Sequence, residues 1–192
     1  AEHNYQYDYD ILPGDEPDLK RGFNIFEERE NTDNETIISS FNSIFDTELR
    51  FNDQWKLSSQ VGIQWDQSSQ EQYVGENTFN MRNIREDSSY DENQYIVPKG
   101  GMHTVNNATT SQITWKVQGE YKNTFNDIHD IQIMAGSEIR KNWYNTQFTA
   151  GYGYDPKTLT TKPLNIRNDK DAEKYKLHTK TYQENAFASF YT

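Results

Sequence analysis

The sequence has no cysteine, which excludes both a disulfide framework and a cysteine-ligated metal site. No apolar run approaches the roughly 20 residues that a membrane-spanning helix needs. Hydrophobic residues make up only 33% of the 192 positions, and Tyr, Phe and Trp alone account for 14%. A water-soluble domain of this length would have little aliphatic material with which to offset the chain entropy lost on folding. We therefore expect a chain that is rich in loops or that belongs to a larger protein.

Positive charge is also scarce. The sequence has 19 Lys and Arg residues and 30 Asp and Glu residues, which gives a net charge of −11. Binding to nucleic acid requires a basic surface that releases counterions, so nucleic acid is not expected as a partner. Residues 1–10 show no signal-peptide pattern. Any segment of this chain that crosses a membrane must do so as a β-strand.

The sequence does contain a two-residue alternation between positions 41 and 66. One set of positions is mostly apolar: Phe41, Ser43, Phe45, Thr47, Leu49 and Phe51, then Trp55, Leu57, Ser59, Val61, Ile63 and Trp65. The intervening positions are mostly polar or charged. A period of two is the signature of a strand with two unlike faces. Asn52-Asp53-Gln54 suits a tight turn, so we predict two strands joined in a hairpin.

The same alternation recurs further along the chain. Its apolar positions are Ile113, Trp115, Val117, Gly119 and Tyr121, then, after a turn at Asn126-Asp127, Ile131, Ile133, Ala135, Ser137 and Ile139. A fifth strand begins near Tyr182, and aromatic residues on both of its faces leave its facing open. The sequence therefore predicts strands near residues 37–51, 55–66, 111–125, 128–144 and 182–192.

The predicted connections alternate between short turns and two long loops, residues 67–110 and 145–181. The strands also exceed the roughly 9–11 residues that cross a bilayer at a tilt. Short periplasmic turns and long extracellular loops are typical of outer-membrane barrels. Aromatic residues lie where a barrel places its interfacial girdles: Phe51, Trp55, Tyr121 and Phe125 beside the turns, Trp65 and Trp143 near the loop ends.

The expected fold class is thus all-β, part of a large antiparallel transmembrane β-barrel. The alternative is a soluble β-sandwich or lipocalin-like barrel, which also alternates polar and apolar faces. It is disfavoured because one face is so uniformly polar or charged and because soluble domains seldom carry loops this long.

Three segments carry a family resemblance: FNSIFDTELRFNDQWKLSSQVGIQWD, ITWKVQGEYKNTFNDIHDIQIMAGSEIRK and YQENAFASFYT. They include a Gly-x-Glu at Gly136-Ser137-Glu138 and a Glu-Asn that opens a strand of small and aromatic residues, Glu184 to Tyr191. In this order the segments resemble the barrel of SusC-like (SusC/RagA family) TonB-dependent outer-membrane transporters of Bacteroidetes.

The resemblance implies a barrel of about 22 strands that is closed by an N-terminal plug. It also implies import of glycan oligosaccharides or peptides with energy relayed by TonB, and a SusD-like surface lipoprotein as partner. Neither a plug domain nor a TonB box is found in residues 1–192. We therefore expect a fragment of the barrel domain, about five strands with their external loops, in the bacterial outer membrane. Glycan is the first expectation for the substrate and peptide the second.

The polar face is expected to point into the lumen, to hydrate it and to contact the plug: Asp46, Glu48, Arg50, Lys56, Gln60, Gln64, Lys116, Glu120, Glu138 and Arg140. The apolar face is expected to meet outer-membrane lipid. Aromatic residues in the loops are candidates for substrate contact: Tyr73, Tyr90, Tyr95, Tyr152 and Tyr154. These tyrosines could instead order the loops against each other. An alternative function is a secreted or surface glycan-binding β-protein without transport activity, with the same tyrosines as its site.

No catalytic signature is present, because His3, His103, His129 and His178 lie far apart and no nucleophile or phosphate-binding motif occurs. An enzyme is not expected, and no cofactor is assigned. Two segments are acidic, residues 27–35 and 168–173, and the second is expected to be a solvated loop. Asp169, Asp171 and Glu173 have a spacing that could contribute to a calcium site, but the glycine and final glutamate of an EF-hand loop are missing.

Overall fold

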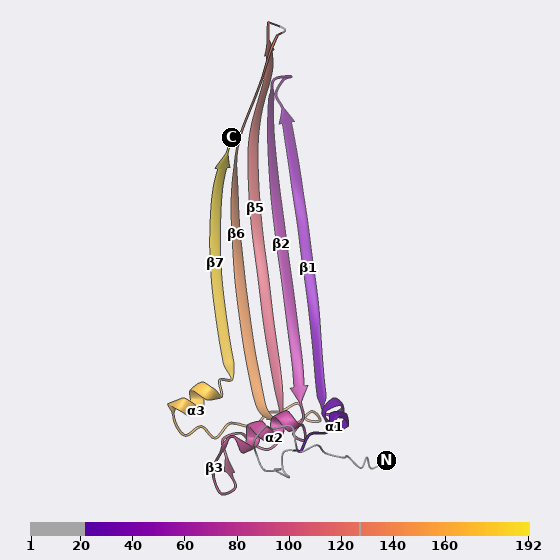
Figure 1. Cartoon of the computed structure of the whole chain (residues 1–192), viewed down its shortest axis with the longest axis vertical. Coiled ribbons are helices and arrows are strands. Elements are labelled where there is room, and N and C mark those ends of the chain that lie inside the picture. Colours follow the sequence, from indigo (N-terminus) through magenta and orange to yellow (C-terminus); the bar gives the residue numbers. More distant parts are fainter. Residues whose placement is uncertain (1–21, 127) are drawn as a thin grey trace. The chain divides into compact units, whose positions relative to one another are not determined.

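Five long strands dominate the computed structural model, which describes residues 22–126 and 128–192 (Figure 1). They are β1 (Thr32–Arg50), β2 (Trp55–Val74), β5 (Gly101–Phe125), β6 (His129–Tyr154) and β7 (His178–Tyr191). They pair in this same order, β1-β2-β5-β6-β7, in one sheet. The sheet is antiparallel and not closed, and the all-β prediction is confirmed.

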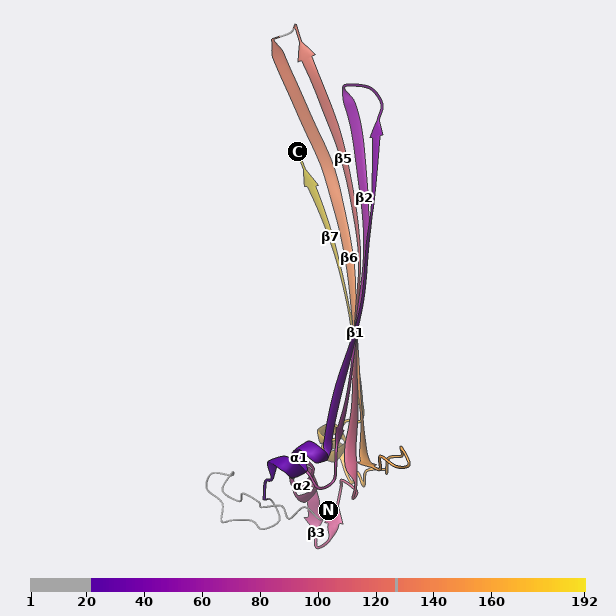
Figure 2. The same cartoon turned by 90° about the vertical axis from the view of Figure 1, so that its right-hand side faces the viewer.

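Tight turns join β1 to β2 and β5 to β6 (Figure 2). In the first turn the Asn52 side chain accepts hydrogen bonds from the backbone N–H groups of Gln54 and Trp55, at 2.9 and 2.8 Å. This local bond is why Asn suits the position. In the second turn Asn126 has a positive φ of 53°, which Asn tolerates better than most residues. Asp127 lies outside the described residues.

The strands extend further than the sequence pattern predicts. Residues 67–74, 101–110 and 145–154 were expected in the long loops, yet they continue β2, β5 and β6. Their polar side chains pair across strands, as when Ser69 Oγ donates to Asn107 Oδ1 at 2.7 Å, so no apolar alternation marks them. The connections that remain outside these strands are residues 75–100 and 155–177.

These connections hold short elements that the sequence did not predict: α2 (Phe79–Glu86), β3 (Ser89–Asp91), β4 (Gln94–Tyr95) and α3 (Asp169–Lys174). A further helix, α1 (Ile25–Glu30), precedes β1. Each helix begins after a polar N-cap residue, namely Asn24, Thr78 and Asn168. Among the described residues, no helix has the length and apolar character required to span a membrane.

The chain divides into two compact units. Of the described residues, the first comprises 22–37, Ser69–Asn107 and Gln147–Thr179, and the second comprises Ile38–Ser68, 108–126 with 128–146, and Lys180–Thr192. The buried hydrophobic residues of the described chain lie in the first unit: Val74, Met81, Ile96, Val97, Ala150 and Tyr175. The second unit is a piece of sheet most of whose large hydrophobic side chains are exposed.

Candidate functional site

One face of the sheet in the second unit carries polar side chains that join three strands. Gln60 Nε2 of β2 donates to Asp46 Oδ1 of β1 at 2.7 Å. Lys56 Nζ of β2 lies 3.4 Å from Glu48 Oε2 of β1 and 3.6 Å from Glu120 Oε2 of β5. Five of the ten residues predicted to face a lumen are therefore in contact across the strands, in one group of two and one group of three.

The other five lie at alternating positions of the same face and make local contacts. Arg50 and Arg140 bind the carboxylates two residues before them, Glu48 and Glu138, each at 2.8 Å. Gln64 donates to Asp66 at 2.6 Å, and the Lys116 ammonium lies 5.6 Å from the centre of the Tyr191 ring. A cavity of about 350 Å³ opens on this region, lined in part by Asp46, Glu48, Gln60, Lys116 and Gln118.

These ion pairs add little to the stability of the sheet. The side chains of Lys56 and Glu48 are 34% and 43% exposed, and an exposed ion pair contributes little because water screens it. The chemical consequence of the polar face is therefore hydration: it presents donors and acceptors of both charges to water or to a polar partner.

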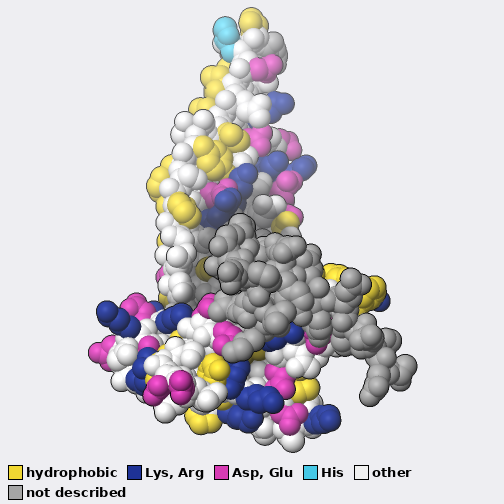
Figure 3. Space-filling view, turned by 60° about the horizontal axis from the view of Figure 1, so that its bottom comes forward, with side chains coloured by type: hydrophobic (Ala, Val, Ile, Leu, Met, Phe, Trp, Pro, Cys, Tyr) yellow, Lys and Arg dark blue, Asp and Glu magenta, His cyan; other side chains and the backbone are white. Residues whose placement is uncertain are grey.

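The opposite face of the second unit is apolar and exposed. Phe45 is 60% exposed, Ile133 58% and Phe190 83%. Figure 3 shows hydrophobic side chains along one flank of the strands and charged side chains along the other. Leaving apolar area in water costs about 25 cal/mol per Å², and a continuous apolar patch marks a surface that contacts protein or membrane. This face requires an apolar neighbour.

Tyr191 determines the facing of β7, which the sequence left open. Its hydroxyl donates to Gln118 Oε1 at 3.3 Å, and its ring covers Gly136 so closely that an added Cβ would overlap it. Gln118 and Gly136 both lie on the polar face. The odd-numbered residues of β7 therefore face the polar side, and the even-numbered residues from Tyr182 to Phe190 face the apolar side.

Gly136→Ala is expected to lower the free energy of unfolding by about 1–3 kcal/mol, because its methyl group overpacks the site under Tyr191. Urea unfolding of the full-length protein in detergent measures this. Gly119→Ala is the matched control on β5, because a Cβ added at Gly119 would lie 3.9 Å from its nearest neighbouring atom and would fit without a clash. Adding Tyr191→Ala should recover part of the loss, and equal losses in Gly136→Ala and Gly119→Ala would contradict the packing account.

The five predicted substrate tyrosines lie in the first unit, and three of them pack against side chains of the loops. Each has a close neighbour: Arg167 lies 3.8 Å over the Tyr90 ring, Arg85 lies 4.2 Å over Tyr95, and the Tyr175 ring lies 6.1 Å from Tyr152. Burial raises the pKa of the Tyr152 hydroxyl, and Tyr175 adds to the shift. Contacts of this kind favour a role in ordering the loops for these three tyrosines.

The remaining two, Tyr73 and Tyr154, lie together with ring centres 5.6 Å apart. The His103 ring stacks on Tyr154 at 4.8 Å, and His103 Nε2 lies 2.6 Å from Glu71 Oε1. They line a cavity of about 270 Å³ with Asp33, Glu35, Pro156 and Leu159. Burial, followed by the nearby carboxylates of Glu76 and Asp155, raises the pKa of Tyr73. The sequence did not predict the participation of His103 and Glu71, which are paired only by the register of β2 and β5.

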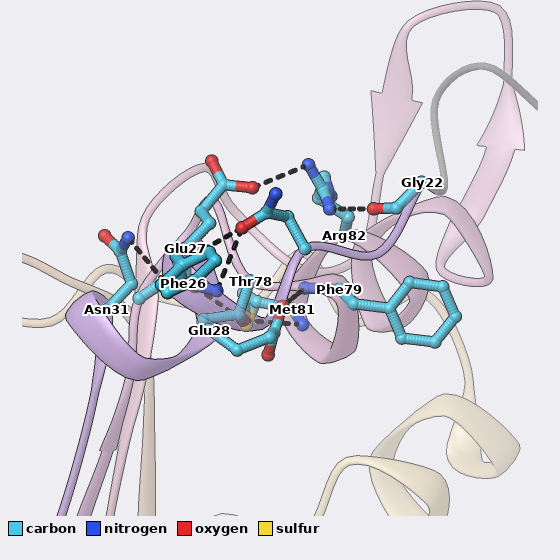
Figure 4. Close-up of polar contacts among 11 residues, drawn as sticks. Gly22, Phe26, Glu27, Glu28, Asn31, Thr78, Phe79, Met81 and Arg82 are labelled. Carbon is cyan, nitrogen blue, oxygen red and sulfur yellow. Dashed lines mark hydrogen bonds and ion pairs between the residues drawn. The ribbon is translucent and has the colours of Figure 1, made fainter. Parts of the chain in front are cut away.

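Polar contacts between α1 and α2 hold the chain before β1 against the loop after β2 (Figure 4). Glu27 is only 6% exposed, and its Oε2 lies 3.5 Å from Arg82 Nη1. Arg82 also donates to the carbonyl oxygen of Gly22, and the backbone N–H of Phe79 donates to Glu28. Residues 27–30 of the first acidic segment therefore form part of a packed helix.

The second acidic segment is also a helix instead of a loop. Asp169, Asp171 and Glu173 lie on α3, whose first turn is capped when the Asn168 side chain accepts from the Asp171 N–H at 2.9 Å. Asp171 also lies 3.4 Å from Arg167 Nε. Across residues 22–126 and 128–192, no group of three or more His, Asp or Glu side chains is arranged to hold a metal ion. His3 lies outside the described residues.

Two solved structures share the strand arrangement of this chain. One is the RagAB peptide transporter, with a TM-score of 0.62, and the other is the RagAB peptide importer in the 'closed-closed' state, with a TM-score of 0.61. Each is 14% identical, and each match covers 84% of this chain and 16% of the other. This chain therefore spans about a sixth of those chains, and the likeness is one of fold. No protein-family model and no curated protein matches the sequence.

Proposed function

We propose that this chain forms part of the wall of an outer-membrane transporter of the SusC/RagA type. The observation that carries the proposal is the contrast between the two faces of the same strands. Large apolar side chains such as Phe45 and Ile133 are exposed on one face, while ion pairs such as Lys56–Glu48 cover the other. Lipid outside and water inside satisfy both faces, as in a barrel with a polar lumen.

The aromatic residues of the apolar face support a membrane position. Trp55 packs on Tyr121 beside the turns, with ring centres 4.7 Å apart. Trp65 lies on the same strand and the same face as Trp55, about 33 Å further along at about 3.3 Å per residue. At a tilt of about 40° this spacing is about 25 Å along the membrane normal, the height of the apolar band between two aromatic girdles. Tyr182 lies near the loop end of β7, and Trp143 lies further from the loops, 11 residues before the end of β6.

In this proposal the short turns lie in the periplasm and the loops with α2 and α3 lie outside the cell. The loops would meet the substrate and a SusD-like lipoprotein, and TonB would act through a region that these residues do not include. The solved structures of similar fold are described as a peptide transporter and a peptide importer, so peptide stands beside glycan as the proposed substrate class. No enzymatic step and no cofactor is part of the proposal.

Detergent dependence tests the proposal against a secreted glycan-binding protein. We expect the full-length protein to fractionate with the outer membrane and to leave it only with detergent. We also expect it to migrate differently in SDS with and without heating, as a folded barrel does. A full-length protein that is monodisperse in water without detergent would contradict the membrane position.

A further inference from the structure

We propose that the apolar face of β6 and β7, which would meet lipid, binds the phosphate group of a lipid headgroup through Lys141 and Lys180. This inference rests on the proposed membrane position, which it deepens by naming the lipid group that the wall contacts. The cluster is defined by five residues: Lys141, Trp143, Lys180, Tyr182 and Glu184.

The cluster lies where the character of the apolar face changes. The side chains of Ile139 on β6 and Ala186 on β7 still belong to the apolar face, and the next positions on that face are Lys141 and Glu184. Lys141 Nζ lies 2.5 Å from Glu184 Oε1, which shows that the two strands present these residues side by side. An abrupt change from aliphatic to charged and aromatic side chains marks the level at which acyl chains end and headgroups begin.

The hydrogen bonds within the cluster leave cationic donors exposed. Glu184 uses one carboxylate oxygen for Lys141 and the other for the Tyr182 hydroxyl, which donates to Oε2 at 2.9 Å. The Lys141 ammonium also makes a cation–π contact with Trp143, whose ring centre lies 5.2 Å from Nζ. An ammonium has three N–H donors, and the Lys141 side chain is 40% exposed, so donors remain for an external oxygen.

Lys180 adds the second positive charge. It occupies the same face of β7 as Tyr182 and Glu184, about 13 Å beyond Glu184 at about 3.3 Å per residue. Two lysines and one glutamate give this cluster a net positive charge in a chain whose net charge is −11. A local excess of lysine beside aromatic residues at a membrane boundary complements anionic lipid phosphates.

Quenching by brominated lipids tests this inference in the full-length protein. A fluorescent bimane group is attached to a cysteine placed at Ala186, two residues from Glu184 on the lipid side. Vesicles of phosphatidylcholine receive a small fraction of brominated phosphatidic acid or, in a parallel series, of brominated phosphatidylcholine. Since a lysine near an anionic surface contributes about fivefold in affinity, we expect phosphatidic acid to quench at several-fold lower mole fraction.

The variant Lys141→Gln/Lys180→Gln should reduce this preference to near unity, and Lys157→Gln, an exposed loop lysine, should retain it. Equal quenching by the two brominated lipids, or a preference that survives the double substitution, would overturn the phosphate site. Absence of quenching by vesicles made wholly of brominated phosphatidylcholine would instead refute the membrane position. The two failures are therefore distinguishable.

Discussion

Val61→Arg is expected to prevent most of the full-length protein from assembling in the outer membrane. Val61 lies on the apolar face of β2, six residues after Trp55 and four before Trp65. An arginine facing lipid near the bilayer midplane costs about 2–4 kcal/mol. The measurement is the fraction of protein in the outer membrane that resists SDS without heating.

Gln60→Arg is the matched control, because it places the same charge one residue earlier on the other face of the same strand. Gln60 donates to Asp46 at 2.7 Å, so an arginine there meets a carboxylate in a hydrated setting. We expect near-normal assembly. Equal assembly of the two variants, whether good or poor, would contradict the assignment of the faces.

Arg82→Ala is expected to destabilise the contact between α1 and α2 by about 3 kcal/mol, because it leaves the buried Glu27 carboxylate without its guanidinium. The loop should then open locally while the strands stay folded. Hydrogen exchange of the amides in Phe79–Glu86 measures this in the full-length protein, with exchange expected to accelerate by about a hundredfold for this free energy.

Arg29→Ala is the control for this second variant, since Arg29 is an exposed arginine of α1. Its exchange rates should stay close to those of the unaltered protein. Adding Glu27→Gln to Arg82→Ala removes the buried charge and should restore part of the protection. If Arg29→Ala and Arg82→Ala accelerate exchange equally, the ion pair is not what holds the loop.

The low hydrophobic content of the sequence disfavours a soluble core but fits the proposed barrel wall. In such a wall each strand would need apolar side chains at alternate positions only, because the other positions would face water. In the proposed membrane position, the apolar positions would gain their stabilisation from lipid instead of from a second layer of protein. The small buried core in the first unit, around Val97 and Met81, serves the loops.

The sequence predicted the strands wherever one face is apolar, as from Trp55 to Trp65, because a two-residue period is then visible. It placed the end of β2 too early because Ser69 and its neighbours are polar on both faces. The short helices were missed for a related reason. Asn24, Thr78 and Asn168 are readable as caps, but helices of six to eight residues have little stability of their own and depend on contacts such as Glu27–Arg82.

Contacts between distant strands could not be predicted without the register. Lys141 and Glu184 are far apart in sequence, and β7 carries aromatic residues on both faces, so its alternation alone does not indicate which side Glu184 takes. The contact between His103 of β5 and Glu71 of β2 also depends on the register of the two strands. Tyr191 over Gly136 resolves the first case, since a ring of that size fits only where the facing strand has no side chain.

The most direct test of the two-faced wall is a scan of spin labels at positions 57–65 of β2, one at a time, in the full-length protein in lipid vesicles. Residues 1–192 contain no cysteine, and any cysteine elsewhere in the full-length protein is replaced by serine before labelling. Accessibility to oxygen, which concentrates in lipid, should peak at the odd positions, and accessibility to a water-soluble nickel complex should peak at the even positions. A scan without a two-residue period, or with nickel accessibility high at odd and even positions alike, would contradict a strand that lies between lipid and a hydrated lumen.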